Sequence, residues 1–122
     1  MDQFSAFLEN TFGDRLRSVT YYDQSSVEYV YLRDGVLEAY TEETVDQIVN
    51  DLRLESMGKP VEESRFNHGD LQARVSCFEN GTEMNFAFGK GEGVVVGLER
   101  GALVTEGTFI GRCLDELGTP EQ

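Results

Sequence analysis

The sequence contains few of the residues that metal binding and catalysis require. His68 is the single histidine, and Cys77 and Cys113 are the two cysteines. Cysteines this far apart, with one histidine, form neither a disulfide framework nor a zinc-ligand set. Both fall on the apolar side of a predicted element, so we expect two free, buried thiols. No metal site and no cofactor are predicted.

A general base is the catalytic role open to His68, with Asp70 as the group that would orient its ring. The alternative is a surface or half-buried histidine that is hydrogen-bonded locally, and we favour it because both thiols are expected to point into the core. No catalytic residue is therefore predicted, and we expect a protein that is not an enzyme.

Long apolar runs are also missing. The longest is Val94-Val95-Val96, far below the roughly 20 residues that a membrane span needs. Residues 1–4 carry no basic head followed by an apolar stretch, so no signal peptide is visible. We expect a cytoplasmic protein without a membrane partner.

Basic residues are scarce: 10 Lys and Arg stand against 23 Asp and Glu, which gives a net charge of −13. An acidic surface either attracts a basic partner or keeps a protein soluble in molar salt, where charge repulsion is screened. The acids are spread along the whole chain, which favours adaptation to a halophilic cytosol. Nucleic-acid binding is not expected, because it needs a basic stripe.

The 122 residues, 39% of them hydrophobic, suffice for one domain that spans residues 1–122. Apolar residues at three- and four-residue steps predict a helix over 4–16, which Gly13-Asp14 could end early. Strands are predicted over 18–23 and 27–33. The second strand is apolar on both faces, so we expect it inside the sheet or covered from both sides.

A second helix is predicted from its apolar stripe, Val45, Ile48, Val49 and Leu52, with Thr41 as its N-cap. Residues 36–40 either extend this helix backwards or form a separate turn. The polar stretch 55–69 contains glycine and proline and is predicted to be a flexible loop.

A hairpin is predicted around Asn80-Gly81, which would pair Cys77 with Met84 and Val75 with Phe86. The same register pairs Ala73 with Phe88. The glycine-rich segment 89–93 is predicted to be a hairpin turn, because a phosphate-binding loop would join a strand to a helix. Residues 94–98 then form a central strand, residues 105–117 a helix, and residues 118–122 a tail. The fold class is therefore α+β, a single, mostly antiparallel five-stranded sheet in the order α-β-β-α-β-β-β-α.

Candidate binding residues lie near the ends of these elements, where opposite charges adjoin. They are Arg33, Asp34, Arg53, His68 and Asp70. The alternative is that these residues form ordinary exposed ion pairs, such as Arg53 with Glu55, which are common and contribute little to stability. The tyrosines at 21, 22, 29 and 31 are expected in the core, although some must face a second layer, a cleft or a partner.

The order of elements resembles that of roadblock/longin-type and profilin-like modules. The segments that carry this resemblance are 4–16, 19–32, 45–52, 71–98 and 109–117. It implies a noncatalytic scaffold or regulator that dimerises, often in connection with small GTPases. The polar hairpin face that carries Arg74 and Glu83 departs from the pattern, because both sheet faces of those modules are usually covered.

Four short segments resemble small haloarchaeal proteins, a likeness that supports salt adaptation and implies no activity. They are Tyr31-Leu32-Arg33-Asp34, Leu52-Arg53-Leu54-Glu55, His68-Gly69-Asp70-Leu71 and Cys77-Phe78.

Two noncatalytic functions follow from these observations. The first is a regulatory or scaffolding module that binds another protein, or itself as a homodimer, through a helix or a sheet edge. The alternative is a PAS-like sensor whose small ligand lies between the sheet and residues 36–52. An apolar cavity lined by tyrosines would favour the sensor, and a filled core would exclude it.

Overall fold

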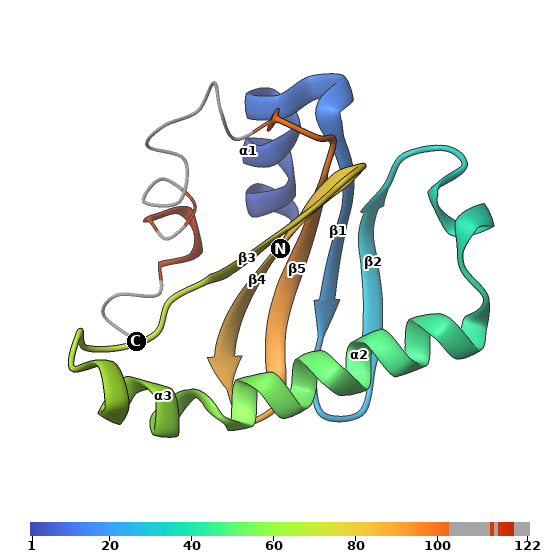
Figure 1. Ribbon diagram of the computed structural model, residues 1–122. Helices are drawn as coiled ribbons and strands as arrows, with labels where there is room; N and C mark the ends of the chain where they lie inside the picture. The colour runs from blue at the N-terminus through green and yellow to red at the C-terminus, as the bar shows by residue number, and fades with distance from the viewer. Residues whose placement is uncertain (103–112, 114, 119–122) are drawn as a thin grey trace.

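The computed structural model describes residues 1–102, 113 and 115–118 and contains one five-stranded sheet with helices on both faces (Figure 1). The fold class is α+β, as predicted. The elements in chain order are α1 (Asp2–Phe12), the 3-10 turn η1 (Gly13–Arg15), β1 (Leu16–Tyr22), β2 (Val27–Leu32), the 3-10 turn η2 (Val36–Ala39), α2 (Glu42–Met57), α3 (Lys59–Phe66), β3 (Arg74–Phe78), β4 (Gly81–Gly89) and β5 (Glu92–Leu98).

The strand order is β2-β1-β5-β4-β3, and every neighbouring pair is antiparallel. The last strand therefore lies in the centre, where it joins the β1–β2 hairpin to the β3–β4 hairpin, as its apolar sequence predicted. β2 lies at an edge. Its apolar residues lie on both faces of the sheet. Val30 and Tyr31 pack against the core, and Tyr29 and Leu32 lie on the opposite face.

The hydrophobic core fills the space between α1 and one face of the sheet. Phe4, Leu8 and Phe12 of α1 are buried there against Val94 and Val96 of β5. Each such side chain contributes about 1.5–3 kcal/mol when it is fully buried. α1 is shorter than the predicted helix because Gly13 adopts a positive φ of 55° and ends it, so that Leu16 already begins β1.

The prediction of a flexible loop over residues 55–69 is wrong. α2 continues to Met57, and α3 follows after Gly58. Pro60 lies in the first turn of α3, where a missing N–H breaks no helical hydrogen bond. The segment is polar because α3 buries none of its residues, so its composition resembles that of a loop.

The start of α2 resolves the alternative left open for residues 36–40. Residues 36–39 form the separate turn η2, and Thr41 caps α2 by accepting a hydrogen bond from the backbone N–H of Thr44 at 3.0 Å. The predicted N-cap is therefore confirmed.

The β3–β4 hairpin has the predicted faces but a different register. Val75 pairs with Met84 and Cys77 with Thr82, two residues away from the predicted partners. The turn is consequently Glu79-Asn80. A shift of two keeps every side chain on its face, so the alternating pattern cannot distinguish the two registers. The predicted pairing of Ala73 falls outside β3.

The two thiols differ in their surroundings. Cys77 is exposed on the edge strand, which contradicts the expectation that it is buried, whereas Cys113 is buried. β3 pairs with β4 alone, so one side of Cys77 has no neighbouring strand to cover it.

The glycine-rich segment forms a turn between β4 and β5, as predicted, with positive φ at Lys90 (58°) and Gly91 (78°). Most of the helix predicted over 105–117, and the tail after 118, lie outside the described residues. Cys113 and residues 115–117 are helical. Among the described residues, no helix is long and apolar enough to cross a membrane.

The two faces of β5 differ because of two glycines. Val94, Val96 and Leu98 face the core, whereas Gly93 and Gly97 lie on the face beneath α2. A Cβ on Gly93 would lie 2.5 Å from the hydroxyl oxygen of Tyr22, so the missing side chain lets the tyrosine cross the strand.

We predict that Gly93→Ala destabilises the protein by about 1–3 kcal/mol, because the added methyl group would overlap Tyr22 and the carbonyl oxygen of Phe86 at 2.8 Å. Gly58→Ala is the matched control, since its Cβ would meet no atom closer than 3.6 Å. Chemical denaturation of both variants measures the difference. Wild-type stability of Gly93→Ala would contradict the packing of Tyr22 across β5.

Candidate functional site

The sheet face beneath α2 is polar where the opposite face is apolar. Thr20 and Asn85 are buried on it, and Ser18 and Glu83 are half-buried. Buried polar groups are costly unless they are hydrogen-bonded. This face therefore requires either an internal network or a ligand, and it has a network at one end and an open space at the other.

The network is centred on Asn85. Its Oδ1 accepts a hydrogen bond from the hydroxyl of Tyr22 at 2.7 Å, and its Nδ2 donates to Glu55 Oε1 of α2 at 3.0 Å. Arg74 of β3 pairs with the same carboxylate at 3.2 Å and also with Glu62 of α3. Burial raises the pKa of Tyr22 to about 12. These contacts fix the end of α2 to the sheet.

Arg53 fixes the same part of α2 to the β1–β2 turn. Its Nε donates to the carbonyl oxygen of Asp23 at 2.7 Å, and its Nη2 donates to that of Ser26 at 3.4 Å. The turn is itself ordered by the Asp23 carboxylate, whose pKa is lowered by hydrogen bonds from Ser25 and Ser26.

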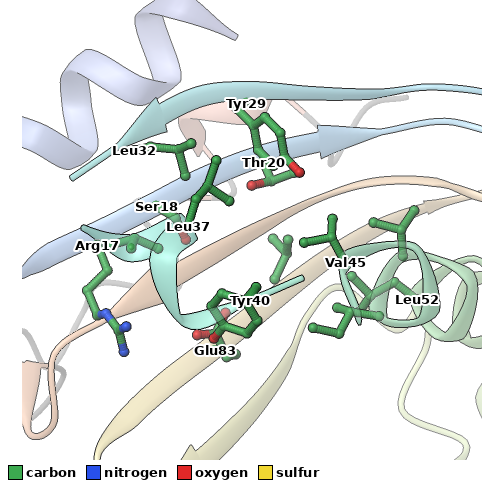
Figure 2. Close-up of a pocket in the computed structure, with 14 residues that line it drawn as sticks. Arg17, Ser18, Thr20, Tyr29, Leu32, Leu37, Tyr40, Val45, Leu52 and Glu83 are labelled. Carbon is green, nitrogen blue, oxygen red and sulfur yellow. The ribbon is translucent and has the colours of Figure 1, made fainter. Parts of the chain in front are cut away.

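A cavity of about 90 Å³ lies beneath η2 and the first half of α2 (Figure 2). Its walls are mostly apolar and come from β1, β2, β5, η2 and α2. They are Thr20, Tyr29, Leu32, Val36, Leu37, Tyr40, Val45, Ile48, Val49, Leu52 and Val95. This is the space between the sheet and residues 36–52 in which a sensor ligand was expected, and two tyrosines line it.

The polar end of the cavity is formed by Arg17, Ser18 and Glu83. Burial raises the pKa of the Glu83 carboxyl to about 7, and Arg17 opposes this rise. The Nε of Arg17 is buried and has no hydrogen-bond partner among the described residues. Gly97 gives these groups room, because a Cβ there would lie 2.6 Å from Ser18 Oγ and 3.1 Å from Glu83 Oε2.

The five residues predicted from the sequence do not come together. Arg33 pairs with Glu99 at 2.9 Å and donates to the carbonyl oxygen of Asp14 at 2.9 Å, so it joins three chain segments. Arg53 holds the β1–β2 turn, as described above. Asp34 and His68 are exposed. Asp70 lines a separate hollow of about 450 Å³ beside Lys59 and Glu92. None of the five lines the cavity beneath α2.

The sequence reasoning missed Glu83 and Arg17. One signal was available for Glu83: it alternates with Met84 and Phe86 in a strand that pairs with the central strand, which places a carboxyl group on a covered face. No such signal exists for Arg17, which lies where the register between β1 and β5 shifts.

The four tyrosines of the predicted group lie in four different environments. Tyr29 lines the cavity, Tyr22 belongs to the Asn85 network, and Tyr31 packs against the core. Tyr21 donates a hydrogen bond to Glu92, which raises the pKa of the Tyr21 hydroxyl to about 12.

Comparison with known protein families gives a match that covers most of the chain. A family model described as a domain of unknown function matches residues 2–118. The chain belongs to the DUF7522 family. The whole cavity lies within the region that matches DUF7522. None of the curated proteins matches the chain.

The part of the chain that the structure describes holds no cluster of three or more His, Cys, Asp or Glu side chains able to bind a metal ion. The cavity offers a bound molecule apolar contact along its walls, with one carboxyl group and one guanidinium at its polar end.

We predict that Glu83→Gln makes the protein more stable than the wild type at pH 8 but not at pH 4. Because the folded-state pKa of about 7 exceeds the ordinary value of 4.5, the stability of the wild type falls as the pH rises between these values. The loss is on the order of 3 kcal/mol.

Urea denaturation at a series of pH values measures this effect. Arg17, Tyr29 and Tyr40 are the other ionisable groups that face the cavity, and they are unchanged in the variant. Glu79→Gln, in the exposed β3–β4 turn, is the control and should retain the wild-type pH profile. Parallel profiles for Glu83→Gln and the wild type would rule out a buried Glu83.

Proposed function

We propose that the chain is a noncatalytic sensor module that binds a small molecule between the sheet and α2. The observation that carries this proposal is the cavity of about 90 Å³ beneath residues 36–52, lined by two tyrosines and closed at one end by Glu83 and Arg17. An apolar pocket with a few convergent polar groups is the usual form of a small-molecule site.

The two ends of α2 are attached to the sheet by different kinds of contact, and this difference suits a sensor. Its C-terminal end is held through Arg53 and Glu55, and Ser56 Oγ accepts a hydrogen bond from the backbone N–H of Gly91 at 2.9 Å. Among the described residues, no side chain from 42 to 49 makes a hydrogen bond or an ion pair to the sheet. A ligand would therefore act on the end of α2 that apolar contacts alone hold in place.

We predict that Val45→Phe abolishes binding of small molecules by filling the cavity. Val45 lines the cavity (Figure 2), and phenylalanine adds roughly the volume of several methylene groups. Val61→Phe is the matched control, because Val61 is 52% exposed on α3 and lies outside the cavity.

The measurement is ligand-observed NMR in molar KCl with small alcohols, amines, carboxylates and amino acids. At least one class should bind to the wild type and to Val61→Phe but not to Val45→Phe. Binding that survives in Val45→Phe, or no binding to the wild type, would contradict the proposal.

A second candidate function is the regulatory or scaffolding role, with a homodimer as its simplest form. The observation that favours it is β3, an edge strand whose Val75 and Phe78 are 43% and 62% exposed. The unpaired backbone groups and apolar side chains of such an edge are suited to pairing with another strand. The resemblance to modules that dimerise points in the same direction.

We predict that the wild type is a dimer and that Phe78→Lys is a monomer, because a lysine on an edge strand opposes strand pairing. Light scattering after size exclusion in molar KCl measures the mass. The buffer contains a reductant, since Cys77 on the same strand is exposed and could form a disulfide between copies. Phe66→Lys, at a 66% exposed position on α3, should remain a dimer. A monomeric wild type would count against this function.

A further inference from the structure

The carboxyl group of Glu83 faces the cavity without a partner. No described residue donates a hydrogen bond to it, and no Lys, Arg or His nitrogen in the described part of the chain lies within ion-pair distance of it. A buried carboxyl group in this state is stabilised by any cation or N–H donor that enters the cavity. Its raised pKa, which follows from burial, agrees with the missing partner.

The Nε–H of Arg17 is the second unsatisfied group at this end. It is buried, and none of the described residues accepts a hydrogen bond from it. Arg17 influences the charge of Glu83 but forms no ion pair with it. Figure 2 shows both side chains on the same side of the cavity, so one small ligand can meet both.

The rest of the cavity limits the ligand to a small aliphatic body. An apolar cavity of 150 Å³ holds a molecule of the size of benzene, and the present volume is about 90 Å³. Val45, Ile48 and Leu52 of α2 offer this body apolar contact and no hydrogen-bonding group.

We propose that the ligand is a small zwitterion, an α-amino acid with a short aliphatic side chain, whose ammonium group binds Glu83 and whose carboxylate binds Arg17. This inference rests on the proposed sensor function and adds the ligand class. A simple amine would leave the Nε–H of Arg17 without an acceptor. A simple carboxylate would lie beside the carboxylate of Glu83, and the two negative charges would repel each other. A zwitterion satisfies both groups, each through a charge-assisted hydrogen bond.

Three probes that differ by one charged group test the proposal: L-alanine, ethylamine, which lacks the carboxylate, and propanoate, which lacks the ammonium group. Calorimetry at pH 8 in molar KCl measures their affinities, because the salt screens the attraction of the acidic surface for any cation. L-Alanine should bind at least tenfold more tightly than either of the other two. If ethylamine or propanoate binds as tightly as L-alanine, the ligand is not a zwitterion.

The affinity for L-alanine should fall about tenfold between pH 8 and pH 6, because the ionised fraction of Glu83 falls by that factor around a pKa of about 7. Glu83→Gln should abolish this pH dependence, and Arg17→Met should lower the affinity for L-alanine to that for ethylamine. Glu79→Gln and Arg65→Met, both at exposed positions outside the cavity, should bind as the wild type does. An unchanged affinity in Glu83→Gln would overturn the assignment.

The outcomes also separate this inference from the sensor function. If an alcohol binds to the wild type and not to Val45→Phe, but L-alanine does not bind, the zwitterion is wrong and the sensor function stands. If no compound binds, both fail.

Discussion

The arrangement of this protein depends on the two different faces of its central strand. Val94, Val96 and Leu98 of β5 face α1 and form a dry core, whereas Gly93 and Gly97 face α2. Side chains at positions 93 and 97, added to that of Val95 on this face, would push α2 away or fill the space beneath it. The two glycines instead let Tyr22 cross the strand and let Ser18 and Glu83 lie close to the backbone. The dry core and the polar face therefore both follow from the alternation of large side chains and glycines along β5.

The polar face is satisfied at one end and open at the other. Near Gly93, Tyr22, Asn85 and Glu55 form a continuous set of hydrogen bonds that fixes the C-terminal part of α2. Near Gly97, the corresponding groups are Glu83 and Arg17, which do not pair. A half-satisfied polar cluster destabilises a fold, and clusters of this kind are found where proteins bind ligands. This contrast within one sheet face is the physical basis for placing function beneath η2 and the N-terminal half of α2.

The family match covers most of the chain and assigns it no chemistry. Residues 2–118 belong to DUF7522, and the fold alone does not imply an activity. The two candidate functions use different surfaces, the cavity beneath α2 and the free edge of β3, and they are compatible in one molecule. The edge strand β3 lies on one side of β4, and the cavity extends over β1, β2 and β5 on the other side, so a change at the edge need not disturb the cavity.

The sequence by itself determined the elements whose signal is local. The stripe from Val45 to Leu52, the Thr41 cap and the turn at 89–93 each follow from side-chain spacing or backbone preference over a few residues, and they predicted the fold class and the space in which the cavity lies. Three features did not follow from the local sequence, and tertiary packing decided two of them. The hairpin register was decided by packing, because a shift by two leaves the alternating pattern unchanged. The helix α3 could not be distinguished from a loop, because it buries no residue. Arg17 and Glu83 line the same cavity because β1 and β4 both pair with the central strand β5, and no local pattern encodes the proximity of residues 66 positions apart.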